Sequence, residues 1–496
     1  MTKHFLPAAL FAVFGADATA AHATVTISSA PTANMSCSAG VCAPTAVDAV
    51  LNVGDLQTLL TSGDVSVTTT GSNVQANSIH TTAALTWPNK SALTLDAFQS
   101  VTIDKPVSVG GTGGLSLKIN DGGSGGRLSF GDKGHITFAN LSSPLSINGS
   151  SYTLVKGVKT LARAIVANPS GAYALAGADD ASRDGTYKEQ PVATAFAGKF
   201  EGLGNAISNL SMNLHTSRGK NDIVGMFYEV TASGSIADLR LDHLRLKARA
   251  PTDVSSDAGG LVGNNLGVLE GDEVSGSAIS QSVAIGGLTA GNSGTIEYSS
   301  ADVSINARDG GGIVAVNAGT ISLSHAAGSL SGGGAGGLAY FNTVEGTITQ
   351  SYATGNVSGL DVGGLISVNQ GEIDNSYATG TVTGTFDGSL VGGMAGEDAA
   401  ITTSYSTGMV GCTTGCEVGG FVGRADFVHQ DDYWDTTTSG TDQGTGDLGN
   451  GAGITGLTSR KLKSGLPSGF DSSIWAEDKK INNGFPYLIN NPPEKK

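Results

Sequence analysis

Short apolar runs that alternate with polar residues extend through most of the chain. Over residues 24–155 these runs include VSVTTT, SVTIDKPVSV and LSINGSSYTLV, and Gly, Asn and Asp separate them. Alternation with a period of two residues predicts strands that bury one face, and the separating residues predict tight turns. The pattern therefore predicts a β-rich protein made of many short strands.

Two segments depart from this alternation. Val158, Leu161, Ala162 and Ile165 fall at helical spacing and precede Asn168-Pro169, so a helix is predicted over 158–167. A second short helix is predicted at 53–60 (VGDLQTLL). We expect these helices to cap a β structure, because exposed sheet ends aggregate.

A Gly-Gly-apolar unit recurs seven times at an almost constant period. The second glycines of these doublets lie 27, 25, 25, 27, 29 and 27 residues apart. Repeats of this length are typical of solenoids, in which each unit stacks on its neighbour. The doublets are Gly259-Gly260, Gly286-Gly287, Gly311-Gly312, Gly336-Gly337, Gly363-Gly364, Gly392-Gly393 and Gly419-Gly420.

A second unit follows most doublets, as in GTITQSYATGNVSG and GEIDNSYATGTVTG. Its isoleucines predict an apolar column, and the residue three positions later is always Ser, which predicts a column of hydroxyls at an inward corner. The first repeat carries an insertion of about ten residues in this alignment. The aligned pairs are Ile279 and Ser282, Ile296 and Ser299, Ile321 and Ser324, Ile348 and Ser351, Ile373 and Ser376, and Ile401 and Ser404.

These repeats predict an all-β protein whose core is a right-handed parallel β-helix. Units of two or three strands would stack at about 4.8 Å per rung and place like residues in columns. Propeller blades need longer repeats, and the leucine-rich repeat pattern is missing. We expect an export signal at 1–23, an irregular β-helical region at 24–155, a helix and entry segment at 156–230, the repeat β-helix at 231–430, and a C-terminal cap at 431–496.

Composition narrows the function classes. Gly accounts for 74 of 496 residues and charged residues for 14%, which disfavours helical bundles, whereas 39% hydrophobic residues disfavour disorder. The formal net charge of −16 argues against a nucleic-acid partner. No later stretch approaches 20 apolar residues, so we expect no membrane insertion of the mature chain.

The N-terminus and the cysteines predict a secreted or cell-surface protein. Lys3 precedes an apolar run (FLPAALFAVFG) and small-residue cleavage sites at Ala18-Thr19-Ala20 or Ala21-His22-Ala23, which are typical of a signal peptide. The simpler alternative is a buried N-terminal helix. Two local disulfides are predicted, Cys37 with Cys42 and Cys412 with Cys416, and no nearby His completes a zinc site.

The units GGLVG-x-N and GTI-x-x-SYATG-x-V-x-G resemble the GLUG motif of exported bacterial proteins similar to filamentous haemagglutinin. FEGLGNAISNLSM (200–212) resembles the segment before GLUG arrays, and YWDTTTSG (433–440) and LPSGFDSSIW (466–475) resemble their usual ending. The resemblance covers roughly residues 170–490. It implies a right-handed β-helix on or outside a bacterial cell, with a role in adhesion. Some proteins with this motif are zinc peptidases, but their H-E-x-x-H motif is absent here.

Catalytic motifs are weak. The G-x-S-x-G match at 122–126 and the G-x-G-x-x-G matches at 332–337 and 444–449 lack a strand–turn–helix context, and the histidines are scattered. Asp431, Asp432, Asp442 and Asp447 are acidic residues close in sequence. We therefore expect no enzyme activity and no cofactor, with Ca²⁺ in the acidic loops and a polysaccharide-active enzyme (a lyase or glycosidase) as the alternatives.

The most informative candidate site is aromatic. Tyr352, Tyr377 and Tyr405 lie four residues after the aligned isoleucines, and Tyr433 continues the series. An outward-facing column would stack rings about 5 Å apart and bind a cell-surface glycan or protein. The alternative is that the rings only stabilise the edge of the coil. The predicted function is an adhesin-like protein, and a purely structural spacer remains a further alternative.

Overall fold

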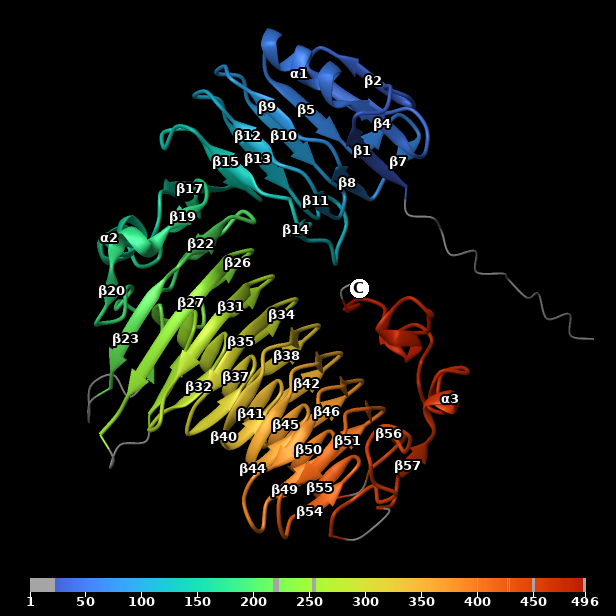
Figure 1. Ribbon diagram of the computed structural model, residues 1–496. Coiled ribbons are helices and arrows are strands. Elements are labelled where there is room, and N and C mark those ends of the chain that lie inside the picture. Colours follow the sequence, from blue (N-terminus) through green and yellow to red (C-terminus); the bar gives the residue numbers. More distant parts are fainter. Residues whose placement is uncertain are drawn as a thin grey trace, which may run out of the picture.

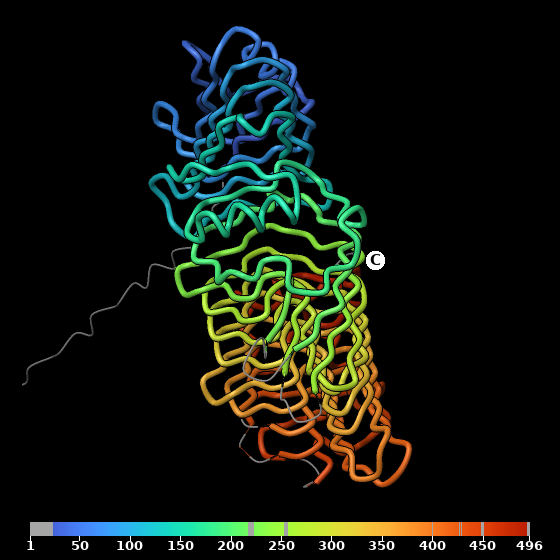
Figure 2. The backbone as a smooth tube through the Cα atoms, turned by 90° about the vertical axis from the view of Figure 1, so that its left-hand side faces the viewer, coloured from blue at the N-terminus to red at the C-terminus, as the bar shows by residue number. Residues whose placement is uncertain are grey.

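The computed structural model describes residues 23–216, 223–251, 256–398, 400–425, 427, 429–447 and 451–493. The chain is mostly β, with short strands stacked in long parallel sheets as in a β-solenoid. Figure 2 shows the coils following one another along a single long stack, from the N-terminal coils to the repeats. The predicted signal peptide lies almost entirely in residues 1–22, outside the described residues.

The N-terminal coils place three strands of each rung in three parallel sheets. One rung consists of β8 (Ser78–Thr81), β9 (Leu85–Trp87) and β10 (Leu93–Asp96), and the next of β11 (Val101–Ile103), β12 (Val107–Val109) and β13 (Leu115–Lys118). Alternate side chains point inward, so that Ile79 and Val101 pair in register within the core. The alternation of apolar and polar residues thus produces this region as predicted.

The glycine-doublet repeats form the larger part of the stack (Figure 1). One repeat consists of β33 (Thr289–Asn292), β34 (Thr295–Glu297), β35 (Ser300–Asn306) and β36 (Asp309–Gly311). The first glycine of every doublet pairs with the first glycine of the next, from Gly259 to Gly419. The prediction that the doublets line up along one edge is confirmed.

Close packing of backbones explains the doublets. A Cβ on Gly286 would lie 1.8 Å from the carbonyl oxygen of Thr289, and one on Gly312 would lie 2.1 Å from the carbonyl oxygen of Gly337. Neither glycine has a positive φ. The positive-φ corners instead carry non-glycine residues one position before the serine column, namely Tyr298, Leu323, Gln350, Asn375 and Thr403.

The isoleucine and serine columns form, but their first members differ from the prediction. Leu269, not Ile279, pairs with Ile296, and Asp272, not Ser282, therefore precedes Ser299. Ile279 lies on the outer face and is 50% exposed. The sequence alignment was wrong in this repeat because Ile279, the last residue of β31 (Glu273–Ile279), is also followed by Ser three residues later, as the inward-facing isoleucines are.

Both predicted helices are present. α1 (Val53–Ser62) begins after its N-cap Asn52 and packs Leu56 and Leu60 on the N-terminal core. α2 (Val158–Ala167) buries Val158, Leu161 and Ile165 on the core of the repeats. Among the described residues, none of the helices is long and apolar enough to cross a bilayer.

The C-terminal residues do more than close the end of the stack. After β56 (Asp432–Asp435) and β57 (Ile454–Leu457), residues 458–493, here called the C-terminal segment, run back beside the repeats (Figure 1). The segment contains α3 (Ser459–Leu462), β58 (Trp475–Ala476) and β59 (Tyr487–Leu488). Near its end, Asn491 donates hydrogen bonds to the carbonyls of Ser324 and Gln350, several rungs before β57.

Candidate functional site

The tyrosine column consists of Tyr352, Tyr377, Tyr405 and Tyr433, on strands that pair in register. The first three rings stack at 4.7 and 5.1 Å with nearly parallel planes, and His325 stacks on Tyr352 at 4.8 Å. The predicted stacking distance of about 5 Å is therefore present.

The exposure expected for this column is wrong in this structure. Tyr377 and Tyr405 are fully buried, and Tyr352 and Tyr433 are 2% and 6% exposed. The C-terminal segment covers them with a shell of apolar side chains. This shell contains Leu462, Phe470, Trp475, Phe485 and Leu488.

Hydrogen bonds anchor the C-terminal segment to the column. The Tyr405 hydroxyl donates to the carbonyl of Pro486 at 2.6 Å, and the Tyr433 hydroxyl donates to the carbonyl of Ser468 at 2.9 Å. The Trp475 indole N–H donates to Asn375 at 2.9 Å. Burial raises the pKa of the Tyr377 and Tyr405 hydroxyls well above the ordinary value. These contacts agree with the alternative in which the rings stabilise the edge of the coil.

A side groove of about 690 Å³ runs between the C-terminal segment and the sheet. His325, Tyr352 and a series of threonines line its floor, and Lys480 and Phe485 contribute to its wall. Burial lowers the pKa of His325 to about 4, against a hydrogen bond with Asn491, so this ring is neutral near pH 7. Three carboxylates also line this groove: Asp242, Glu273 and Asp302.

An open groove of about 580 Å³ lies on another part of the same sheet and is here called the hydroxyl groove. Two outward columns line it, each with one residue from five consecutive rungs. The first column is Ser277, Ser304, Ser329, Asn356 and Thr381, and the second is Ile279, Asn306, Ser331, Ser358 and Thr383. Among the residues that the structure describes, no charged side chain lines this groove.

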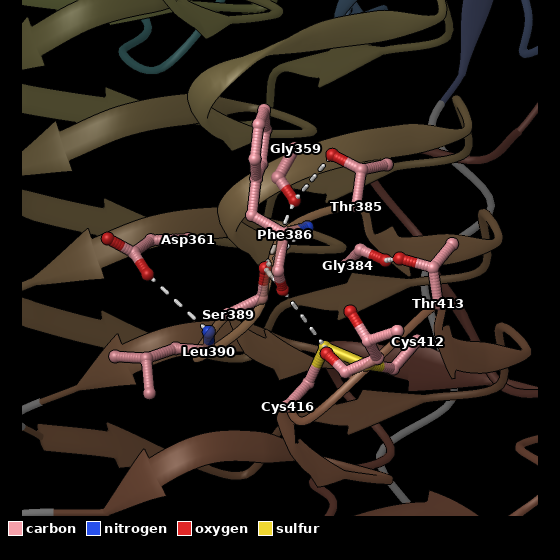
Figure 3. Close-up of a disulfide and its surroundings, with 11 residues drawn as sticks. Gly359, Asp361, Gly384, Thr385, Phe386, Ser389, Leu390, Cys412, Thr413 and Cys416 are labelled. Carbon is pink, nitrogen blue, oxygen red and sulfur yellow. Dashed lines mark hydrogen bonds between the residues drawn. A yellow bond between two sulfur atoms is a disulfide. The ribbon is translucent and has the colours of Figure 1, made fainter.

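The second disulfide lies next to an inserted loop that contains Thr385 and Phe386 (Figure 3). Residues 385–389 are inserted directly after β48 (Val382–Gly384), and the loop closed by Cys412 and Cys416 lies in the next rung. Thr385 donates to the carbonyl of Gly359, and Phe386 is 55% exposed. Both predicted disulfides are present, and Cys37–Cys42 joins the hairpin of β2 (Met35–Ser38) and β3 (Val41–Pro44).

The repeats also contain an internal asparagine ladder, which was not predicted from the sequence. Each side-chain amide donates to the side-chain oxygen of the next Asn at 2.8 Å. The signal was available, because an Asn occurs five residues after the second glycine of each of the first five doublets. The ladder consists of Asn265, Asn292, Asn317, Asn342 and Asn369.

The serine column is a second internal ladder. Each hydroxyl accepts from the backbone N–H of the preceding rung and donates to a carbonyl two residues earlier in its own chain, as Ser351 does with Ser324 and Thr349. At the far end Asp432 replaces Ser and accepts from the N–H of Ser404 at 2.9 Å. Buried backbone groups at these corners are therefore satisfied by side chains.

A buried ion cluster connects the ends of both ladders. His429 lies 3.2 Å from Asp398, which follows Asn369 in its column, and 3.0 Å from Asp432. Burial opposes a charge on His429, but its hydrogen bonds to the two carboxylates outweigh burial and raise its pKa to about 9. Burial raises the pKa of Asp432 to about 7. Because the side chains of this cluster are fully buried, we assign it a role in stabilising the fold.

In the part of the chain that the structure describes, no three His, Cys, Asp or Glu side chains are arranged to hold a metal ion. The glycines at 122–126 lie in a turn between β13 and β14 (Leu128–Phe130), without a following helix. Asp431 and Asp432 separate, with Asp432 buried and Asp431 at a positive-φ corner.

Comparison with known proteins identifies one motif. Residues 358–383 match the family model described as the GLUG motif. These residues lie in the repeats that border the hydroxyl groove. No curated protein matches the chain.

One solved structure resembles the chain at a distance. It is the crystal structure of a "putative immunoglobulin A1 protease" from Bacteroides ovatus, with a TM-score of 0.38 and 14% sequence identity. The alignment covers 69% of this chain and 93% of that chain. The two disulfides favour an extracytoplasmic location, because such bonds persist in oxidising compartments.

Proposed function

We propose that this protein is a secreted or cell-surface bacterial adhesin-like protein, similar to the filamentous haemagglutinin group, and that it is not an enzyme. It contacts other surfaces through the repetitive outer face of its coils. The finer architecture that accompanies this proposal is a right-handed parallel β-helix with closed rungs, capped by α1 and by the C-terminal segment. Its partner is a cell-surface glycan or protein, and it requires no cofactor.

The hydroxyl groove is the observation that carries this proposal. Apart from Ile279, its two columns present uncharged polar side chains over five rungs, and such a surface makes many weak contacts with an extended partner. The groove replaces the tyrosine column as the candidate binding surface, because the C-terminal segment covers the tyrosines.

Cell attachment of the purified protein tests the proposal. Ser329 is exposed in the middle of the first column, so Ser329→Tyr would obstruct the groove without filling the core. The matched control is Ser472→Tyr, at an exposed position on the C-terminal segment. We expect attachment to fall severalfold for Ser329→Tyr only. Equal attachment of both variants would overturn this assignment and leave the spacer role as the better one.

A polysaccharide-active enzyme is the second candidate. The side groove favours it, because Asp242, Glu273 and Asp302 line one groove together with His325. Glycoside cleavage requires two carboxyl groups that act as acid and as base or nucleophile. Reducing-end release from acidic and neutral polysaccharides, measured for the protein and for Asp302→Asn, tests this candidate. Release that is lost in the variant would support it, and no release would reject it.

A further inference from the structure

A row of basic residues lies at the N-terminal end of the hydroxyl groove. Strand β27 (Arg240–Arg249) alternates inward apolar residues with outward Arg245, Lys247 and Arg249, all three exposed. Among the described residues none of these three cations has an ion-pair partner, although the whole chain carries a net charge of −16. Three outward cations on one strand therefore concentrate positive charge on an otherwise acidic protein.

Strand register places this row in line with the groove. Arg245 pairs with Ser277, the first member of one column, and Lys247 pairs with Ile279, the first member of the other. One rung, about 4.8 Å, separates the cations from the groove, and the five rungs of the groove extend over roughly 19 Å. The two columns therefore form a continuous path that begins with positive charge and continues without charge.

From this path we infer that the hydroxyl groove binds a short linear glycan that is neutral along its length and ends in an acidic sugar. The inference rests on the proposed function and names the ligand of the same surface. The carboxylate of the terminal sugar pairs with Arg245 and Lys247, and the hydroxyls of the neutral sugars exchange hydrogen bonds with the Ser, Asn and Thr side chains.

The distribution of charge along the groove favours this ligand over a polyanion and over a wholly neutral glycan. A polyanion would place further negative charge along a groove whose described lining residues include no cation, on a protein of net charge −16. A wholly neutral glycan would leave the basic row unused. Phe386, on the loop that follows β48 and its Thr383, adds an aromatic ring that is 55% exposed and suited to the apolar face of a sugar (Figure 3).

The test compares two oligosaccharides that differ only in a terminal sialic acid. Binding of the full chain is measured by calorimetry at low and at moderate salt. We expect the acid-terminated oligosaccharide to bind about tenfold more tightly, and this preference to decrease as salt screens the charges. The double variant Arg245→Ala/Lys247→Ala should remove the preference and leave binding of the neutral oligosaccharide unchanged. The control Lys133→Ala/Lys188→Ala removes two exposed cations from other surfaces and should keep the preference.

Each result separates this inference from the proposed function. Equal binding of the two oligosaccharides, no binding of either, a preference that survives Arg245→Ala/Lys247→Ala, or equally tight binding of an acidic peptide of the same charge would overturn the inference. The proposed function would still hold if Ser329→Tyr reduced cell attachment. If Ser329→Tyr changed neither attachment nor glycan binding, while circular dichroism showed an intact fold, both would be overturned.

Discussion

At the scale of single residues, repetition turns ordinary polar side chains into continuous networks. One Asn in a buried corner would leave amide groups unsatisfied, but Asn317 donates to Asn342 and accepts from Asn292. The same logic lets Ser residues satisfy the backbone at positive-φ corners. Each member is therefore stabilised by its two neighbours along the stack.

Substitution in the middle of the asparagine ladder tests this interdependence. Asn317→Leu removes a donor and an acceptor and leaves buried groups on Asn292 and Asn342 without their partner. We expect a loss of roughly 2–3 kcal/mol in the free energy of unfolding, measured by urea denaturation. Ser304→Ala, an exposed substitution nearby, is the control and should cost under about 0.5 kcal/mol. Equal costs would contradict the role of the ladder.

The glycine doublets allow a matched comparison. Gly312→Ala places a Cβ against a backbone oxygen of the next rung, and this contact cannot relax without separating the rungs. Gly411→Ala adds the same Cβ where no atom lies within 4 Å. We expect the first variant to lose about 1–3 kcal/mol or more and the second to be nearly neutral, by thermal and urea unfolding. A neutral Gly312→Ala would show that the doublets serve another purpose.

At the scale of elements, the C-terminal segment decides which surfaces are available. Its aromatic side chains cover the tyrosine column, and its Lys480 and Phe485 help to form the side groove. The C-terminal segment, which has no repeats, thus buries part of the outer face of the repeats and forms with it a third, smaller hydrophobic core. The hydroxyl groove lies outside this covered area and stays open to solvent.

Removing one anchor of this segment should detach it from the tyrosines. Trp475→Ala eliminates a fully buried indole and its hydrogen bond to Asn375, a truncation that costs about 3–5 kcal/mol. We expect protease to cleave within 458–493 faster, and tyrosine ionisation, followed by absorbance, to begin at lower pH as Tyr377 and Tyr405 become hydrated. Trp87→Ala, in the N-terminal core, is the control. Unchanged cleavage in Trp475→Ala would contradict this anchoring role.

The sequence predicts most of the local structure and misses the long-range contacts, and the asparagine ladder is the repeated feature that it did not predict. The register of the doublets, the isoleucine column from Ile296 onward, both helices and both disulfides follow from local pattern and spacing. The docking of the C-terminal segment does not, because its contacts join residues as far apart as Asn491 and Ser324 without any periodic signal. The alternating Arg245, Lys247 and Arg249 of β27 are present in the sequence, but the net negative charge of the chain gave no reason to expect a basic surface there.

At the scale of the whole molecule, buried carboxyl groups make the stability of the protein depend on pH. The chain carries a net charge of −16, and several of its carboxyl groups, such as those of Glu201 and Asp272, are buried. Burial raises the pKa of Asp238 to about 8 and the pKa of Glu201 and Asp272 well above the ordinary value, near the junction of the two cores. A carboxyl group with a raised folded-state pKa stabilises the protein at low pH and loses this contribution as pH rises through the raised value.

His429 extends this dependence to higher pH at the opposite end of the repeats. Its folded-state pKa of about 9 lies above the unfolded value near 6.5, so its contribution is complete below pH 6.5 and is lost as the pH rises through 9. We therefore expect the melting temperature of the protein to fall steadily between pH 6.5 and 9.

In His429→Gln the fall of the melting temperature over this interval should be smaller. The variant should nevertheless be less stable than the parent at pH 6, because Asp398 and Asp432 lose their cationic partner. Asp238→Asn should instead reduce the pH dependence between pH 4 and 8 and leave the interval above pH 8 unchanged. Calorimetric scans at pH 5, 6.5, 8 and 9 distinguish the two variants, and parallel curves for His429→Gln and the parent protein would refute the assignment to this buried histidine.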